Sequence, residues 1–174
     1  MSHLGMDVGV FRGLLSAAPV GPRMEIGVLR GSTLAMIAAH SGETYGVDSF
    51  EGMAEPGERD IVNGINNYPK GRFATPVSIV QQAVPSAILI KGFVPEILSN
   101  VPDGPFAFVH LDLDHYAPTK AALEWLFPRM ADGGILLCDD WFAGQDFLAA
   151  GALNEVAIER PLSGTNGRKA WWVF

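Results

Sequence analysis

The sequence predicts an α/β fold built on a doubly wound, mostly parallel sheet with an antiparallel strand near the C-terminus. Short apolar runs alternate with segments of helical spacing for most of the chain, which is typical of βαβ units. The run Phe106 to Leu111 is apolar almost throughout, as strands buried on both faces of a parallel sheet are. The last segment breaks the alternation, and an antiparallel strand is common at such a place in a mixed sheet.

The expected helices show apolar residues at helical spacing or a start signal in the first turn. Ser32 can cap the second helix, and Pro76 is suited to the first turn of the third. Gly151 weakens the last helix, because glycine disfavours helix interiors. We expect helices over residues 8–18, 32–39, 76–84, 93–98 (a single turn), 118–130 and 145–159.

The expected strands are short apolar runs bounded by turn residues. We expect them over residues 23–28, 44–48, 87–91, 106–112, 135–138 and 169–174, with a turn over 164–167. The segment 49–73 is long and rich in Gly, Pro and Asn. A loop of that length in a compact domain is usually functional or mobile.

The bulk properties restrict the function. A chain of 174 residues without an internal repeat fits one domain, here taken as residues 1–174. The net charge is -7 and there is no basic stripe, which disfavours nucleic acid and anionic membranes as partners. The single cysteine, Cys138, lies in an apolar run, so we expect it to be structural and the compartment to be reducing. With no signal peptide and no apolar run of the roughly 20 residues that a membrane span needs, a cytoplasmic location is expected.

The first motif is a glycine turn, Glu25-Ile26-Gly27-Val28-Leu29-Arg30-Gly31-Ser32, between a strand and a helix. Such a turn lets backbone approach a ligand, although many α/β proteins have one only to pack strand against helix. The glycine spacing differs from the dinucleotide fingerprint G-x-G-x-x-G. Glu25 would repel a pyrophosphate and pair with an ammonium group, which favours a cofactor that carries an amino acid.

Asp48 ends the next expected strand, about 20 residues beyond Gly27, where nucleoside-binding folds hold ribose hydroxyls with an acid. The alternative is an acidic cap for the loop that begins at Ser49. Together with Glu25, Asp48 favours ribose binding.

A carboxylate cluster follows two further strands: Asp112 and Asp114 after one, Asp139 and Asp140 after the other. If the strands are neighbours, about 4.8 Å apart, these acids meet at one edge and repel each other. A cation, a lysine or bound protons must then compensate, and Mg²⁺ prefers oxygen ligands of this kind. The alternative is a set of helix caps. We expect the neighbouring His110 to be a core histidine rather than a ligand. For His115, both of these roles stay open.

These segments resemble the macrocin O-methyltransferase (TylF-type) family. The resemblance covers roughly residues 23–142 and rests on the glycine turn, Val47 to Met53, Leu111 to Thr119, and Gly133 to Trp141. It implies a Rossmann-like class I methyltransferase fold and Mg²⁺-assisted methylation of a small-molecule hydroxyl, often on a sugar of a natural product. It implies S-adenosylmethionine as the cofactor.

The resemblance also implies roles for individual residues. Glu25 and Gly27 would face the methionine part of the cofactor, and Asp48 would bind its ribose. Asp114 matches the position of the general base. The implied cofactor site consists of Glu25, Gly27, Gly31, Ser32, Asp48, Ser49, Phe50 and Asp112, and the implied metal ligands are Asp112, Asp139 and Asp140.

Two departures from the family leave the acceptor undefined. Family members usually have a longer N-terminal region over the active site, so we expect the lid to be missing, or supplied by residues 49–73 or another subunit. His115 stands where the family commonly has a different residue. The strand with Trp171 and Trp172 could pair across a homodimer or be buried in the sheet.

Two other functions stay open on the sequence. One is a cofactor-binding module that needs a partner for catalysis. The other is a metal-dependent glycosyltransferase, because Asp112-Leu113-Asp114 fits an Asp-x-Asp pattern, although Glu25 and the second acidic pair argue against it. A nicotinamide dehydrogenase is disfavoured by the glycine spacing.

Overall fold

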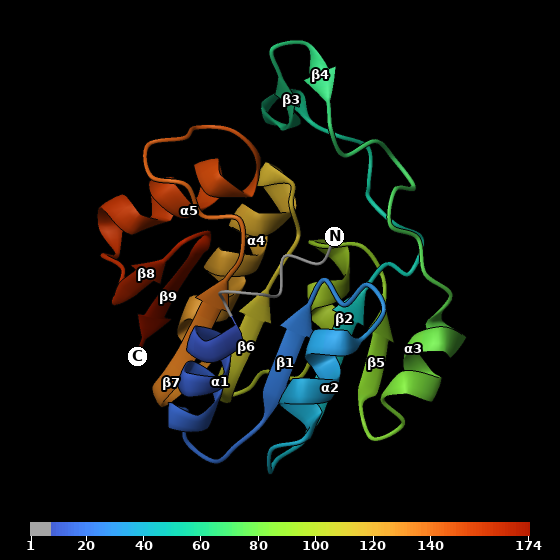
Figure 1. Cartoon of the computed structure of the whole chain (residues 1–174), viewed down its shortest axis with the longest axis vertical. Helices are drawn as coiled ribbons and strands as arrows, with labels where there is room; N and C mark the ends of the chain where they lie inside the picture. The colour runs from blue at the N-terminus through green and yellow to red at the C-terminus, as the bar shows by residue number, and fades with distance from the viewer. Residues whose placement is uncertain (1–7) are drawn as a thin grey trace.

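A seven-stranded sheet in the order β5-β2-β1-β6-β7-β9-β8 forms the centre of the computed structural model, which describes residues 8–174 (Figure 1). Strands β5, β2, β1, β6 and β7 are parallel, while β9 runs antiparallel to β7 and to β8. The expected fold class is therefore confirmed. The strands span Arg23–Ile26 (β1), Thr44–Asp48 (β2), Ile88–Lys91 (β5), Phe106–Leu111 (β6), Met130–Cys138 (β7), Gly164–Asn166 (β8) and Lys169–Val173 (β9).

Helices cover both faces of this sheet. The α-helices span Val8–Ala17 (α1), Ser32–Ala38 (α2), Val77–Ala83 (α3), Tyr116–Leu126 (α4) and Leu148–Glu159 (α5). Short 3₁₀ turns span Glu58–Asp60 (η1), Glu96–Asn100 (η2) and Phe127–Arg129 (η3). None of the helices within residues 8–174 is long and apolar enough to cross a membrane.

Alternate residues of the central strands point to opposite faces, as the pleat requires. Phe108 of β6 packs with Phe11 of α1 and Ile37 of α2 in one buried cluster. Its neighbour Val109 packs in another cluster with Leu123 of α4. The continuous apolar run of β6 is thus explained by burial on both sides. Cys138 lies in the second cluster and is buried, which agrees with a structural role.

The C-terminal hairpin differs from the expectation. Residues 164–166 form the edge strand β8 rather than a turn, and the turn itself follows at Gly167. Strand β9 is hydrogen-bonded on both sides, to β7 and to β8, and Trp172 is buried. Of the two alternatives for this strand, the structure shows burial within the sheet.

Other boundaries shift by a few residues. Strand β7 begins at Met130, before the expected 135, because Met130 pairs with Phe106 ahead of an irregularity in the register. Helix α5 begins at Leu148 instead of 145, because Phe147 is still extended. The helix expected over 118–130 divides into α4 and η3.

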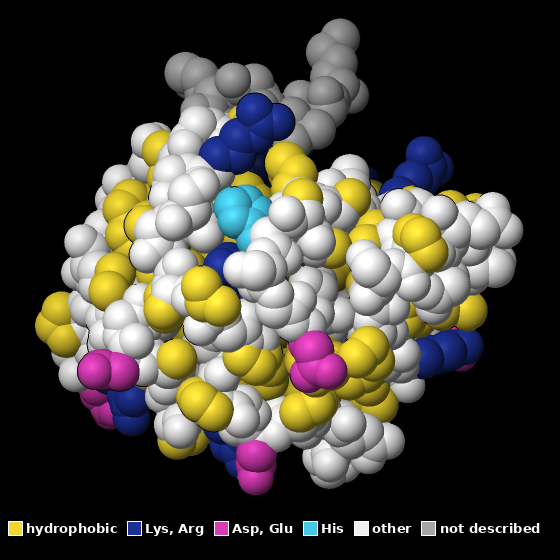
Figure 2. Space-filling model, turned by 90° about the horizontal axis from the view of Figure 1, so that it is seen from below, with side chains coloured by type: hydrophobic (Ala, Val, Ile, Leu, Met, Phe, Trp, Pro, Cys, Tyr) yellow, Lys and Arg dark blue, Asp and Glu magenta, His cyan; other side chains and the backbone are white. Residues whose placement is uncertain are grey.

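The segment 49–73 contains η1 and a small antiparallel hairpin, β3 (Ile61–Val62) with β4 (Ile65–Asn66). This hairpin projects from the sheet, on the side of α4 and α5 (Figure 1). On the face of the molecule shown in Figure 2, the Lys and Arg side chains of the described residues are scattered and form no continuous stripe.

Candidate functional site

A cleft of about 550 Å³ opens at the carboxyl ends of β1, β2, β6 and β7. The strand order reverses between β1 and β6, and ligands of open α/β sheets bind at such a switch point. Most of the predicted site residues line this cleft: Gly27, Ser32, Asp48, Ser49, Asp112, Asp114, Asp139 and Asp140. Glu25 and Phe50 are buried and do not line it, and Gly31 faces Val80 of α3 instead.

The glycines of the turn are required by the packing of the chain. Gly27 has a φ of 87°, and a Cβ there would lie 1.8 Å from the carbonyl oxygen of Asp112. Gly31 has a φ of 81°, and a Cβ there would meet Val80 of α3 at 3.2 Å. Gly27 therefore lets the end of β1 approach the end of β6, which brings the turn and the acids of β6 to one cleft.

Glu25 pairs with a histidine inside the protein. Its Oε1 lies 2.9 Å from Nδ1 of His110, and its Oε2 has no hydrogen-bond partner among residues 8–174. Nε2 of His110 lies 3.7 Å from Oδ1 of Asp139. Burial acts against the charged imidazolium, but the nearby carboxylate of Asp139 and the hydrogen bond with Glu25 outweigh it and raise the pKa of His110 to about 10. His110 is therefore a core histidine, as expected, and a charged link between two predicted site acids.

Asp48 holds the glycine turn against the loop after β2. Its Oδ2 accepts hydrogen bonds from the backbone N–H groups of Val28, at 2.7 Å, and Leu29, at 3.2 Å. Its Oδ1 accepts from the N–H of Phe50 at 2.7 Å, and the Phe50 ring packs into the core with Leu34 and Val80. Asp48 thus caps the loop, as the alternative reading has it, and also lines the cleft. Its ribose contact stays a prediction.

Three of the four clustered acids converge. Carboxylate oxygens of Asp112, Asp114 and Asp140 lie within 4.8 Å of one another. Asp139 instead forms an ion pair with Lys169. Asp114 and Asp140 have φ values of 57° and 61°, a region that non-glycine residues seldom occupy and that is often found at functional sites.

Burial and mutual repulsion shift the pKa values of these acids. Burial and the charge of Asp139 raise the pKa of Asp112 to about 6, and burial and the charge of Asp112 raise that of Asp114 to about 7. Burial also acts to raise the pKa of Asp139, but the charge of the nearby His110 and the hydrogen-bonded ion pair with Lys169 outweigh it and lower the pKa to about 2. Asp139 is therefore neutralised within the protein, whereas burial and repulsion make Asp112 and Asp114 harder to ionise than ordinary carboxylic acids.

Sequence reasoning missed the cations of the site. Arg168 forms an ion pair with Asp140, and both Arg168 and Lys169 line the cleft. The four clustered acids indicated that a compensating cation, such as a lysine, would lie nearby. Nothing in the sequence indicated that this lysine lies in the C-terminal hairpin. The aromatic and basic wall formed by Tyr68, Arg72 and Phe73 was also missed, beyond the expectation that residues 49–73 have a function.

Comparison with known proteins gives a consistent picture. A family model described as a methyltransferase domain matches residues 24–141. The 8-demethyl-8-(2,3-dimethoxy-alpha-L-rhamnosyl)-tetracenomycin-C 4'-O-methyltransferase of Streptomyces olivaceus is 31% identical over 139 residues, which is 70% of this chain and 53% of that protein. The chain thus spans about half the length of this relative.

Solved structures show the same fold. The structure of the O-methyltransferase NovP superposes with a TM-score of 0.78 at 20% identity, covering 95% of this chain and 78% of that one. At that identity the likeness concerns the fold alone. A calicheamicin methyltransferase superposes with a TM-score of 0.68 at 26% identity, covering 96% of this chain and 76% of that one.

Proposed function

The chain belongs to the methyltransferase domain family whose model matches residues 24–141, and from this premise we propose that it is an S-adenosylmethionine-dependent O-methyltransferase. We further propose a hydroxyl of a sugar or other natural product as the acceptor, in line with the macrocin O-methyltransferase resemblance. The names of the relatives from the tetracenomycin and calicheamicin systems support this acceptor class. The glycosyltransferase alternative loses its support, because Asp112 and Asp114 lie within the segment matched by the methyltransferase family.

The observation that carries the proposal is the arrangement of the cleft. Asp48 and the glycine turn lie in the same cavity as Asp112, Asp114 and Asp140. In the proposed complex, Asp48 binds the cofactor ribose and the acids lie beside the reacting hydroxyl. Methyl transfer is a displacement at a sulfonium carbon, so holding the two reactants in line supplies much of the acceleration.

The acidic cluster fits a divalent cation. Carboxylate oxygens are the ligands that Mg²⁺ prefers, and a bound cation would offset the burial and repulsion that raise the pKa values of Asp112 and Asp114. We propose that Asp112 and Asp140 hold Mg²⁺, with Asp139 as a further ligand when it parts from Lys169. When bound there, Mg²⁺ lowers the pKa of the acceptor hydroxyl and fixes its direction.

Asp114 is suited to accept the proton of the acceptor hydroxyl. A general base is most effective when its pKa lies near the working pH, and that of Asp114 is raised to about 7. The hydrogen bond from the N–H of Ala149 to the carbonyl of Asp114, at 2.7 Å, fixes the backbone of this residue against α5. The chain's own contribution is thus a positioned base next to the metal ligands.

Calorimetric titration with S-adenosylmethionine in the presence of Mg²⁺ tests the proposal. We expect saturable one-site binding in the micromolar range, followed by methyl transfer to a sugar hydroxyl in an acceptor screen. Excess EDTA should abolish the transfer while the cofactor still binds. Absence of cofactor binding would contradict the proposed function, and full activity in EDTA would contradict the metal role alone.

Metal binding should depend on pH. Because the pKa values of Asp112 and Asp114 are raised to about 6 and about 7, both acids hold protons at pH 5.5 that a cation must displace. Protons are lost as the pH rises through these values, so Mg²⁺ should bind ~10-fold or more tightly at pH 8 than at pH 5.5. Calorimetry at the two pH values measures this, and Asp114→Asn should reduce the difference. Equal affinities at both pH values would contradict the prediction.

A further inference from the structure

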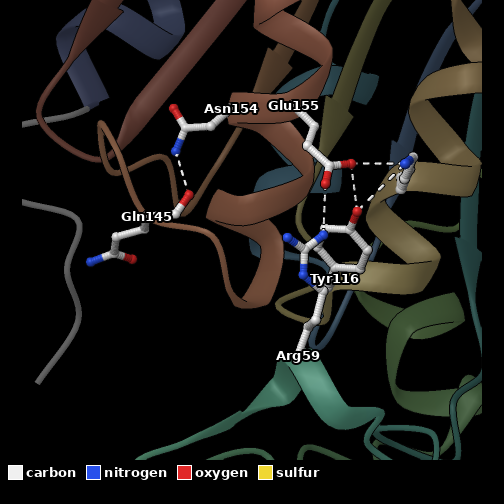
Figure 3. Close-up of polar contacts among 6 residues, drawn as sticks. Arg59, Tyr116, Gln145, Asn154 and Glu155 are labelled. Atoms are coloured by element: carbon white, nitrogen blue, oxygen red, sulfur yellow. Dashed lines mark hydrogen bonds and ion pairs between the residues drawn. The ribbon is translucent and has the colours of Figure 1, made fainter.

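The carboxylate of Glu155 on α5 collects donors from two other parts of the chain (Figure 3). Its Oε1 lies 2.7 Å from Nη1 of Arg59, which belongs to η1. Its Oε2 accepts from the hydroxyl of Tyr116 at 2.5 Å and from Nζ of Lys120 at 2.8 Å, both on α4. The guanidinium of Arg59 also stacks over the Tyr116 ring, 4.1 Å from its centroid. Glu155 therefore joins α4, α5 and the segment 49–73.

The residue after Arg59 makes a second attachment to α4. Asp60 is buried, and its Oδ1 accepts a hydrogen bond from the N–H of Tyr116 at 2.7 Å. Its Oδ2 accepts from the N–H of Gly57 at 2.8 Å, which closes the η1 turn on itself. Asp60 thus satisfies a free N–H at the start of α4, and fixes the turn that presents Arg59 to Glu155.

The same segment continues to the cleft. The backbone carbonyl of Tyr68 lies 3.1 Å from Nε2 of His115, and Tyr68, Arg72 and Phe73 all line the cavity. The Arg72 guanidinium stacks over Phe73 at 4.7 Å. Tyr68 also lines a smaller cavity together with Asp114 and Asp140, which places this end of the wall beside the proposed base. The wall therefore borders the proposed base at Tyr68, while the backbone N–H of Met53, in the loop after β2, donates to the carbonyl of Arg72 at 2.8 Å.

Asn154, the residue preceding Glu155, fixes another segment of the chain. The side-chain amide of Asn154 donates to the carbonyl of Gln145 at 2.9 Å (Figure 3) and to the carbonyl of Phe142 at 2.7 Å. These carbonyls belong to the segment that follows Asp140. Two adjacent residues of α5 thus hold the two segments between which the acceptor would lie.

We propose that Glu155 is a positioning residue for the acceptor: through Arg59 it fixes the segment 57–73, and so places the wall of Tyr68, Arg72 and Phe73 beside Asp114. The kinetic part of this inference rests on the proposed methyltransferase function. The structural part, the ordering of the segment, does not depend on that function.

A single exposed ion pair would not support this role, because such pairs contribute little to stability. The Arg59 and Glu155 side chains are 40% and 37% exposed. Here, however, three donors converge on one carboxylate and a guanidinium stacks on an aromatic ring, so the geometry is fixed by a network. Hydrogen bonds from Lys120, Tyr116 and Arg59 lower the pKa of Glu155 to about 2, which keeps it charged at any physiological pH.

Hydrogen–deuterium exchange of the ligand-free protein tests the structural part. Arg59→Gln and Glu155→Gln should each accelerate exchange in peptides covering 57–73 by ~10-fold, because the segment opens more often. Lys70→Gln is the matched control, since it removes the same charge from the same segment, where Lys70 pairs only loosely with Glu55 at 3.7 Å. Unchanged exchange in the first two variants, or equal acceleration in all three, would overturn the inference.

Steady-state kinetics tests the positioning part. Both variants should raise the KM for the acceptor ~10-fold, with kcat within about threefold of the parent protein and an unchanged Kd for S-adenosylmethionine. A cofactor Kd that weakens as much as the acceptor KM would show general loosening and overturn the assigned role. A third outcome is that neither the parent protein nor the variants bind the cofactor, while hydrogen exchange changes as expected. In that case the methyltransferase proposal fails and the ordering of the segment stands.

Discussion

Replacing Asp114 with Asn is expected to lower kcat for methyl transfer by ~10²- to 10⁴-fold, the range that a general base contributes. The substitution is close to isosteric, and Asn tolerates the positive φ of this position as Asp does, so the change removes the base with little effect on the backbone. The Kd for S-adenosylmethionine should be unchanged, because the proposed ribose ligand Asp48 lies at a different strand end. Single-turnover rates and calorimetry give the two quantities.

The control for this variant is Asp146→Asn. Asp146 is exposed and follows the same acidic region in the chain, so its loss should leave kcat within about twofold. Because Asp114 also lies in the convergent carboxylate set, Mg²⁺ titration separates its two roles. Loss of rate with intact metal binding indicates a base, and loss of both indicates a ligand. A rate equal to that of the parent protein would exclude Asp114 from either role.

Replacing Gly27 with Ala is expected to destabilise the protein by about 3 kcal/mol or more, through the strain of a left-handed residue together with a backbone clash. The added Cβ would lie 1.8 Å from the carbonyl oxygen of Asp112, which is main chain and cannot rotate away. Relief requires β1 and β6 to separate at the cleft, so cofactor and metal binding should weaken as well. Urea denaturation measures the change in the free energy of unfolding.

The Gly133→Ala variant separates the two contributions to the lost stability, the conformational strain and the backbone clash. Gly133 has a φ of 71°, but a Cβ there has no atom within 4 Å. It should therefore show the conformational cost alone, about 1 kcal/mol. Similar losses for the two variants would mean that the contact between Gly27 and Asp112 is not what requires glycine.

Short sequence patterns predicted those strands whose formation depends only on neighbouring residues. Strand β2 occurs over Thr44–Asp48 as expected, because its apolar run is bounded by a glycine and an acid. The acids after β6 and β7 were expected at one sheet edge, and that edge holds the cleft. Both predictions need only a strand, its end and the parallel arrangement of the sheet.

Contacts between distant parts of the chain were beyond the sequence. Lys169 neutralises Asp139 across 30 residues, and Arg59 reaches Glu155 across 96, so neither pair forms a motif. Strand β8, in Gly-Thr-Asn-Gly, has the composition of a turn and becomes a strand only because β9 offers it an edge. The convergence of Asp112, Asp114 and Asp140 likewise depends on backbone conformations that no pattern specifies.

The antiparallel placement of β9 has a consequence for the order in which the protein can assemble. The acids that follow β6 and β7 are synthesised well before Arg168 and Lys169, and these cations reach them only when β9 pairs with β7. Until then, the parallel part of the sheet holds repelling carboxylates at its edge. Completion of the sheet and the pairing of Asp139 and Asp140 with cations are therefore a single event, which links the last strand of the chain to an acidic edge that begins more than fifty residues earlier, at Asp112.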